Sequence, residues 1–281
     1  MTKVHKYDTL ALNNATLNDY FTRLYNIAVS LVHWHNLPSS VSEREIEVGL
    51  CKYGHMLYFN DEVIGDLCLP STNSGKIDIY NIPTIRRVDT ASGYHRTLNS
   101  TNSVIIWNNK LRRPTLPTIQ LFANRLYQVQ RAIDVNIQQQ KMPYIILCSE
   151  QQRLTFTNLI AKYEGNNPFI FGDTTLQVDG IKVLPATAPY IADKLEIEKH
   201  QILNDFLTFL GVNNANQDKK ERLVADEVSA NDANIQASIN VFMQSRQQAA
   251  DEINRMFPHE KPIYPTFDVD NYNKLIVDLA Y

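Results

Sequence analysis

The chain has 281 residues, of which 44% are hydrophobic and 20% charged, and this length and composition are typical of a folded globular protein. Its 9 Gly and 12 Pro exclude a collagen-like or low-complexity chain. With 27 Lys and Arg against 30 Asp and Glu, the net charge is −3. The total charge therefore lacks the basic excess that is usual in nucleic-acid-binding proteins.

The cysteine content and the hydropathy of the sequence indicate the cellular compartment of the protein. Cys51, Cys68 and Cys148 form no Cys-x-x-Cys pair, which favours free thiols in a reducing compartment over a disulfide framework or a zinc site. The amino-terminal residues lack a basic segment followed by an apolar one, and the longest nearly apolar stretch, 27–34, is too short to span a bilayer. We therefore expect a protein that is neither secreted nor inserted in a membrane.

Two helices are predicted near the amino terminus. Apolar residues over 17–31 recur every three or four positions and predict a helix that begins at Thr16 and ends before Pro38. A second helix is predicted from Ser42 to Gly54. Serine is a favourable N-cap, and glycine accepts the left-handed conformation of a C-cap.

Residues 55–108 predict an antiparallel β region. Short runs rich in β-branched and aromatic residues alternate there with turn sequences such as Asn-Asp and Ser-Gly. The clearest expected strands are 56–59, 77–80 and 104–107.

Two long helices are predicted on either side of a small α/β segment. The first opens after Pro114 and Pro117 and ends at Met142, whereas the second has Pro189 in its first turn and ends at Gly211. Helices that bracket a compact insert can lie antiparallel, with the insert at one end. Within the insert the sequence predicts a strand at 144–148, a helix at 150–163, a strand at 169–171 and a hairpin around Asp179-Gly180.

One face of the first long helix carries neutral amides and few charges. A solvated helix face normally carries more Glu and Lys, so this face either meets other protein or is an ordinary polar surface. The sequence leaves both interpretations open. The amides are Gln120, Asn124, Gln128, Gln130, Asn136, Gln138, Gln139 and Gln140.

Residues 211–232 show almost no periodicity and predict a long polar loop with a basic cluster at Lys219, Lys220 and Arg222. On one subunit such a cluster is a solvated run of charge. If several copies converged on an axis, the cluster would become a ring of positive charge. The sequence then predicts a third long helix over 235–257, a strand at 263–267 and a short helix at 272–279.

Motifs of common enzyme active sites are missing from the sequence. Gly75-Lys76 lacks the preceding glycine and the following Ser or Thr of a phosphate-binding loop, so no ATPase site is expected. His33 and His35 are two residues apart, which on a helix would point them to different faces and would not favour a shared metal ion. We therefore expect no catalytic activity, no cofactor and no metal.

Several segments resemble one known family, the portal proteins of small short-tailed, protein-primed phages of Gram-positive bacteria. These proteins are also called upper collar or head-to-tail connector proteins. The similarity is close from about Pro117 to Phe257 and looser before it. The segments that carry it are 34–38 (Trp-His-Asn-Leu-Pro), 117–123, 163–168, 170–171, 188–194, 208–211, 214–216, 219–222 (Lys-Lys-Glu-Arg) and 226–229.

The resemblance implies an α+β portal fold that assembles as a dodecameric ring around a DNA channel. It assigns residues 117–142 and 188–211 to two stem helices and residues 143–187 to an α/β clip at the narrow end of the ring. The remaining parts would be a wing at 1–116, a channel loop at 212–232, the long wing helix at 233–257 and a C-terminal segment at 258–281.

The same resemblance suggests which residues contact DNA. Lys219 and Lys220 match the lysines of the family's channel loop, in which Arg222 also lies, and Lys194 matches a stem lysine that faces the channel. Lys182 lies near another channel lysine of the family without aligning to it. Few basic residues suit a conduit, because each lysine–phosphate contact releases counterions and strengthens binding to the passing DNA.

The resemblance also implies the partners and the location. The partners would be double-stranded DNA, the major capsid protein and scaffold, a separate packaging ATPase at the clip, and later the lower collar of the tail. The family's basic amino terminus, which helps to grip a packaging RNA, is reduced here to Lys3 and Lys6, so the use of such an RNA is left open. The expected location is the portal vertex of the virion, after assembly in the host cytoplasm.

Two other functions remain compatible with the residues alone. One is a non-enzymatic accessory protein, monomeric or dimeric, that binds nucleic acid through the same basic loop. The other is an oligomeric scaffold without nucleic-acid contact.

Overall fold

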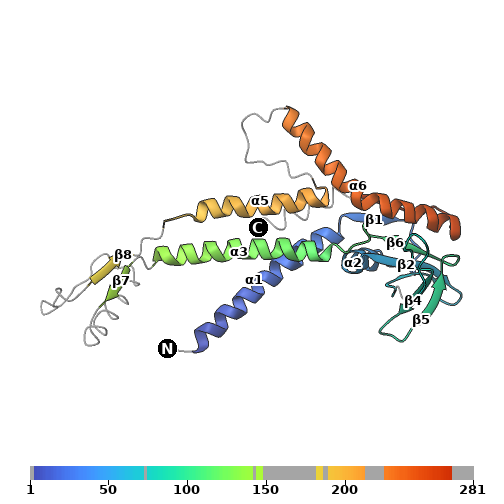
Figure 1. Cartoon of the computed structure of the whole chain (residues 1–281), viewed down its shortest axis with the longest axis horizontal. Helices are drawn as coiled ribbons and strands as arrows, with labels where there is room; N and C mark the ends of the chain where they lie inside the picture. Colours follow the sequence, from blue (N-terminus) through green and yellow to red (C-terminus); the bar gives the residue numbers. More distant parts are fainter. Residues whose placement is uncertain are drawn as a thin grey trace. The chain divides into compact units, whose positions relative to one another are not determined.

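The computed structural model describes residues 3–72, 75–141, 144–147, 182–185, 189–212 and 225–267, with side chains over 14–72, 75–138, 140, 189–212 and 233–267 (Figure 1). The chain divides into a first unit, Met1–Tyr127 with His200–Tyr281, and a second unit, Gln128–Lys199. The predicted helices at 150–163 and 272–279, the strand at 169–171 and the hairpin at Asp179-Gly180 lie outside the described residues.

Most helices and strands belong to the first unit. In chain order these are α1 (Lys3–Val29), β1 (Val32–His35), α2 (Glu43–Tyr53), β2 (His55–Asp61), β3 (Gly65–Leu69), β4 (Ile85–Asp89), β5 (His95–Asn99), β6 (Ser103–Trp107), the beginning of α3 (Leu116–Lys141), the end of α5 (Ala192–Leu210), α6 (Ala225–Met256) and β9 (Tyr264–Phe267). The second unit contains the rest of α3, β7 (Tyr144–Leu147), β8 (Lys182–Pro185) and the beginning of α5. None of the described helices is both long and apolar enough to cross a lipid bilayer.

The first unit is organised around β2, the central strand of the antiparallel sheet β3-β2-β6. Successive side chains of a strand point to opposite faces of its sheet, and β2 is buried on both. On one face, Leu57 and Phe59 pack with Val88 and Leu98 of the β4-β5 hairpin. A strand that is covered on both faces has an apolar side chain at nearly every position, as β2 has from Met56 to Phe59.

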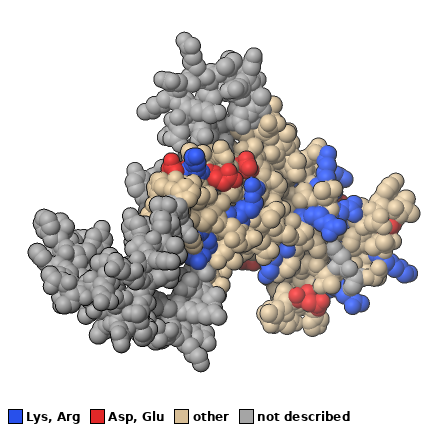
Figure 2. Space-filling view, turned by 60° about the vertical axis from the view of Figure 1, so that its left-hand side comes forward, with Lys and Arg blue, Asp and Glu red and all other residues tan. Residues whose placement is uncertain are grey.

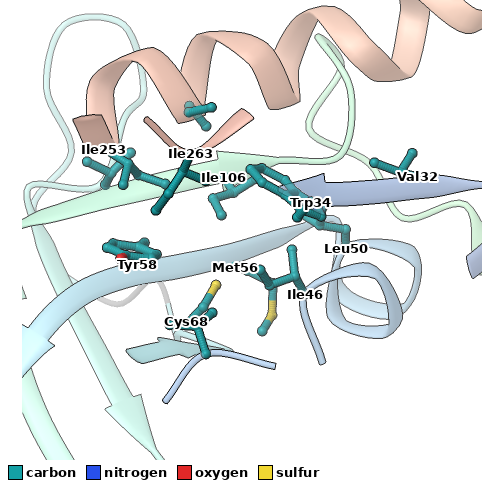
Figure 3. Close-up of a cluster of buried hydrophobic side chains, with 14 residues drawn as sticks. Val32, Trp34, Ile46, Leu50, Met56, Tyr58, Cys68, Ile106, Ile253 and Ile263 are labelled. Carbon is teal, nitrogen blue, oxygen red and sulfur yellow. The ribbon is translucent and has the colours of Figure 1, made fainter. Parts of the chain in front are cut away.

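The other face of β2 forms the main hydrophobic core (Figure 3). Met56 and Tyr58 of β2 meet side chains from α2, β1 and β6, and α6 crosses above them. Among the described residues, the cluster contains 14 buried ones. Full burial of one large apolar side chain contributes about 1.5–3 kcal/mol, so the cluster contributes strongly to the stability of the first unit. Its other labelled members are Val32, Trp34, Ile46, Leu50, Cys68, Ile106, Ile253 and Ile263.

The predicted bounds of α2 and α3 are confirmed. The Ser42 hydroxyl accepts a hydrogen bond from the Glu45 amide at 3.4 Å, which caps the beginning of α2. Gly54 ends the helix with φ at 81°, and its amide donates to the Leu50 carbonyl. α3 begins one residue before Pro117 and ends at Lys141, as the prolines on either side of it predict.

The helix predicted to begin at Thr16 begins earlier, and its predicted apolar stripe, which reaches Leu31, extends past its end. α1 begins at Lys3 and ends at Val29. The next residues form β1, which pairs antiparallel with β9, so that Val32 lies opposite Phe267. A partner more than 200 residues away leaves no trace in local periodicity, and apolar residues at 31, 32 and 34 fit either a helix or a strand.

The β1 strand also corrects the argument about His33 and His35. On a strand, residues two apart share a face, and the two rings lie 4.5 Å apart, edge to face. His33 Nδ1 lies 2.9 Å from Glu43 Oε1, and His35 Nε2 lies 2.8 Å from the Thr266 hydroxyl. Among the described residues, no group of three or more His, Cys, Asp or Glu side chains is placed to hold a metal ion.

The predicted strand at 77–80 is wrong as well. These residues belong to a turn in which the Asp78 carboxylate accepts hydrogen bonds from the Tyr80 and Ile82 amides, at 2.8 and 2.7 Å. This use of an Asp side chain competes with a strand ladder and overrides the β-branched composition. β3, β4 and β5 were not among the expected strands, because polar residues interrupt their apolar pattern.

Two further boundaries differ from prediction. α5 begins at Ala192 and not at Pro189, because the Asn136 side chain holds the Pro189 carbonyl and the Ile191 amide outside the helix, at 2.9 and 3.1 Å. α6 begins at Ala225, so the last part of the predicted loop 211–232 is helical. Its sequence there is acidic, which is favourable at the positive end of a helix dipole. The predicted strands at 144–148 and 263–267 are confirmed to within one residue by β7 and β9.

Candidate nucleic-acid interface

Lys194 is the predicted contact residue whose side chain the structure describes. It is exposed near the beginning of α5, in the second unit. There α5 lies beside α3, since Lys199 Nζ donates to Gln130 Oε1 at 3.3 Å while Asn136 holds the backbone at Ile191. Along α3 these partners rise from 130 to 136, whereas along the α5 segment they fall from 199 to 191. The two helices are therefore antiparallel in this unit, as the sequence suggests.

The paired helices α3 and α5 carry balanced charge. Five basic residues, Arg125, Arg131, Lys141, Lys194 and Lys199, are offset by five acidic ones, Asp134, Asp193, Glu196, Glu198 and Asp205. Lys199 also pairs with Glu196 at 2.6 Å. Figure 2 shows basic and acidic side chains in separate small groups among uncharged residues. Such a surface holds a polyanion only weakly.

The other predicted contacts are described in part or not at all. Lys182 begins β8, and its backbone lies opposite Leu147 of β7 in the second unit. Lys219, Lys220 and Arg222 lie outside the described residues. The structure does describe the end of α5, which directly precedes the segment that contains these three residues.

The end of α5 fixes where this segment leaves the fold. Gly211 has φ at 85°, its amide donates to the Thr208 carbonyl, and the Val212 amide donates to the Leu207 carbonyl. This pair of bonds defines a Schellman C-cap, which confirms Gly211 as the predicted end of the helix. A Cβ at Gly211 would lie 2.5 Å from Ile239 Cγ1 and 2.9 Å from the Ile239 amide nitrogen. The chain is therefore held directly against α6.

Aromatic side chains lock the same junction in the first unit. The Phe122 ring of α3 lies 5.3 Å from Phe206 and 6.4 Å from Phe209, both on α5. Phe209 in turn meets Phe242 of α6 edge to face at 5.8 Å. Each such aromatic pair adds about 0.5–1.5 kcal/mol beyond the burial of its area. The helices that flank residues 213–224 are thus rigidly joined.

A buried ion pair anchors α6 to α2. The Arg246 guanidinium donates to both carboxylate oxygens of Glu47, at 3.0 and 2.7 Å, and to the Asn108 and Phe242 carbonyls. Trp34 Nε1 donates to the same carboxylate at 2.9 Å. The side chains of Arg246 and Glu47 are 4% and 3% exposed, so neither charge could be left unpaired without a large penalty.

Arg246 falls at helical spacing among the apolar residues Phe242, Ala249 and Ile253 of α6. A charged residue at a core position is itself the signal that a buried counter-charge exists. Sequence alone could not identify Glu47 as that counter-charge, because it lies 199 residues earlier.

The two described cysteines are not nucleophiles. Burial, aided by the nearby Glu47 carboxylate, raises the pKa of the Cys51 thiol to about 12. Burial likewise raises the pKa of the Cys68 thiol. Because the thiolate is the reactive form, both side chains act as small apolar core residues.

The chain matches known proteins over most of its length. A sequence profile of the family described as Phage Connector (GP10) matches residues 3–265. A chain in the structure of the portal and tail of native bacteriophage P68 has a TM-score of 0.50 and 14% identity, covering 99% of this chain and 95% of that one. An HK97-family phage portal protein from Corynebacterium diphtheriae has a TM-score of 0.45 and 12% identity, with 91% and 94% covered. A chain from the neck of an empty gene transfer agent particle has a TM-score of 0.44 and 12% identity, with 92% and 82% covered.

The mixed α/β fold is that of phage portal proteins, as the match to the P68 structure shows. Because the profile covers far more than half of the chain, the chain belongs to the Phage Connector family. It is a head-to-tail connector, or portal protein, of a bacteriophage virion, with a role in DNA packaging. The α+β portal fold and the portal function expected from the resemblance are thereby confirmed.

Proposed function

We propose that twelve copies of this connector form a ring at one capsid vertex and that double-stranded DNA passes through its channel, inward during packaging and outward during ejection. The observation that carries the proposal is the antiparallel α3-α5 pair of the second unit, with its balanced charge and exposed Lys194. Twelve subunits would carry 12 × (−3) = −36 charges. A conduit with that charge attracts DNA only where a basic side chain projects.

Lysines at a few levels of such a channel would make transient contacts with phosphates. Each neutralised phosphate strengthens binding, so a wall paved with basic residues would slow the DNA. The residues that we assign to these contacts are Lys182, Lys194, Lys219, Lys220 and Arg222.

The basic segment at 219–222 would act after packaging, when the DNA is under pressure. Its start is fixed by the Gly211 cap and by the contact of Gly211 with Ile239. The Arg246–Glu47 pair holds α6, which follows the segment. A loop with a rigid start can oppose backward movement of DNA, because force on the loop passes directly to the packed helices.

Energy for packaging would come from a separate ATPase that docks at residues 143–187, and the tail's lower collar would bind there later. The wing, residues 1–116 with 233–257, would meet the capsid and the scaffold. The resemblance of 219–222 and its neighbours supports a small short-tailed, protein-primed phage of a Gram-positive host. Purified connector should then hydrolyse no ATP on its own.

Retention of packaged DNA tests the role of the basic segment. We expect particles with Lys219→Ala/Lys220→Ala to package DNA normally but to lose it more readily at low external osmotic pressure, because two basic contacts are missing from every subunit. Lys261→Ala is the matched control, since Lys261 is an exposed lysine outside the assigned contacts. Particles with the double substitution that retain DNA as well as wild type would contradict this role.

A further inference from the structure

A groove of about 500 Å³ lies in the first unit between the loop before α3, the end of α5 and the middle of α6. Its walls are largely apolar and include Phe209 and Phe242. Two further wall residues stand open to solvent, since Leu111 is 82% and Val241 is 52% exposed. Large apolar side chains that gather around one depression mark an interaction site.

The rim of this groove is basic. Lys110 and Arg113 line it, and both side chains are exposed. Among the described residues that line the groove, none is acidic. An occupant that complements it would be apolar on one face and negatively charged elsewhere.

The carboxyl-terminal end of the chain leaves the described fold beside this groove. β9 ends at Phe267, which lines a small adjoining cavity together with Thr115 and Phe242. Thr115 and Phe242 also line the groove. The 14 residues from Asp268 to Tyr281, which lie outside the described residues, could extend about 46 Å at roughly 3.3 Å per residue. The segment is therefore long enough to reach the groove.

The sequence of that segment has the complementary pattern. Tyr272, Leu275, Ile276 and Leu279 are spaced as i, i+3, i+4 and i+7, which is the apolar stripe of a short helix. Three aspartates, at 268, 270 and 278, outweigh the single Lys274. An amphipathic helix with such a stripe is the usual occupant of an apolar groove.

We propose that residues 268–281 dock in this groove of their own chain, with the apolar stripe against Leu111, Val241 and Phe209 and the aspartates near Lys110 and Arg113. The docked segment covers the junction of α3, α5 and α6, from which residues 213–224 depart. The inference does not depend on the assignment as a connector.

Disulfide trapping in the full-length chain tests the docking. In a Cys148→Ser background, Val241→Cys is combined with Leu275→Cys and oxidised with copper phenanthroline. The buried Cys51 and Cys68 react slowly. We expect a disulfide within one chain, detected by peptide mass spectrometry and by monomer mobility on a denaturing, non-reducing gel. No disulfide, or one that joins two chains, would overturn the proposal.

Two controls separate docking from chance collision and from misfolding. Thr97→Cys replaces Val241→Cys as an equally accessible partner on β5, and it should form little disulfide with Leu275→Cys. If Val241→Cys disturbs the fold, Leu111→Cys at the 82% exposed position takes its place. Equal trapping at Thr97 would count against a specific site.

Charge reversal tests the basic rim separately. Lys110→Glu/Arg113→Glu should slow trapping roughly two- to ten-fold, the range expected for exposed ion pairs. Adding Asp268→Lys/Asp270→Lys should restore the rate. A rate that neither pair of substitutions changes would remove the charge complementarity on which the choice of occupant depends.

Discussion

The two units of this chain differ in how they bury apolar surface. The first unit surrounds β2 on both faces and closes the gap between α2 and α6 with the fully bonded Arg246–Glu47 pair. The described part of the second unit consists of the paired stretches of α3 and α5 with the β7-β8 ladder, and it leaves Tyr190 62% and Ile197 59% exposed. The first unit closes a large core within a single chain, although Leu111 and Val241 stay open at its surface. The open side chains of the second unit are available for contact with a neighbouring subunit.

The two units also differ in where their polar side chains find partners. In the first unit, buried polar side chains such as Arg246 and Asn108 find their partners within the chain. In the second unit, α3 carries exposed neutral amides beside exposed Val135 and Ile137, each 42% exposed. Such a mixture is typical of a surface that packs on other protein, which favours the first of the two interpretations that the sequence left open.

The largest expected effect is the loss of the buried ion pair. Arg246→Ala leaves Glu47 charged and unpaired in the core, and it should lower the free energy of unfolding by about 3–5 kcal/mol. Urea titration followed by tryptophan fluorescence measures this directly, because Trp34 donates to the same carboxylate. The exposed neighbour Gln247→Ala should change it by less than about 0.5 kcal/mol. A cost below about 1 kcal/mol for Arg246→Ala would show that the first unit is not held as described.

A substitution at Ile197 tests whether the second unit packs on a neighbouring subunit. Its side chain contributes little to the monomer, so Ile197→Ser should leave monomer stability within about 0.5 kcal/mol of wild type. Between subunits its burial would contribute about 1.5–3 kcal/mol at each contact, so the ring should dissociate at concentrations where wild type stays assembled. Glu198→Ser, at an exposed neighbouring position, is the control. Mass photometry over a dilution series measures the fraction of chains assembled in rings. Equal fractions for Ile197→Ser and Glu198→Ser would contradict a subunit contact at Ile197.

A smaller effect depends on pH and belongs to the first unit. The Tyr94 hydroxyl donates to Asp61 at 2.7 Å and, with the Val63 and Ile64 amides and the Arg96 guanidinium, lowers the pKa of the Asp61 carboxyl. Its contribution to stability is therefore complete above the unfolded pKa of about 3.9 and is lost as the pH falls below it.

Thermal unfolding of Asp61→Asn measures this contribution. The melting temperature should fall below that of wild type at pH 7, and the difference should shrink steadily between about pH 4 and pH 2. Asp89→Asn, at an exposed position of β4, should show no comparable pH dependence. A difference that stays constant down to pH 2 would argue against a carboxylate with a lowered pKa.

The smallest expected effect is at the N-cap of α2. Ser42→Ala removes the hydrogen bond to the Glu45 amide and should reduce the free energy of unfolding by about 0.5–1 kcal/mol. Ser39→Ala, an exposed position before the helix, should have no measurable effect in the same denaturation experiment. Equal values for the two substitutions would show that the cap at Ser42 contributes nothing.

Sequence patterns predicted those parts of the molecule that local chemistry determines. Ser42, Gly54, Pro117 and Gly211 mark helix ends through their own conformational preferences, and all four predicted ends agree with the structure to within one residue. The failures occur where a distant partner decides. β1 is a strand only because β9 lies beside it.

The candidate site shows the same division between local and distant effects. Lys194 lies on the helix predicted after Pro189, and the end of α5 at Gly211 follows from its glycine. The link from Arg246 to Glu47 depends on three-dimensional packing that no local pattern records.

The central claim is that this connector assembles as a ring of twelve chains, and the mass of the purified full-length protein tests it most directly. Mass photometry at nanomolar concentration should show a particle of roughly twelve times 32.2 kDa, with a central opening in end-on electron micrographs. A protein that remains a 32.2 kDa monomer at every concentration up to the micromolar range would contradict the account.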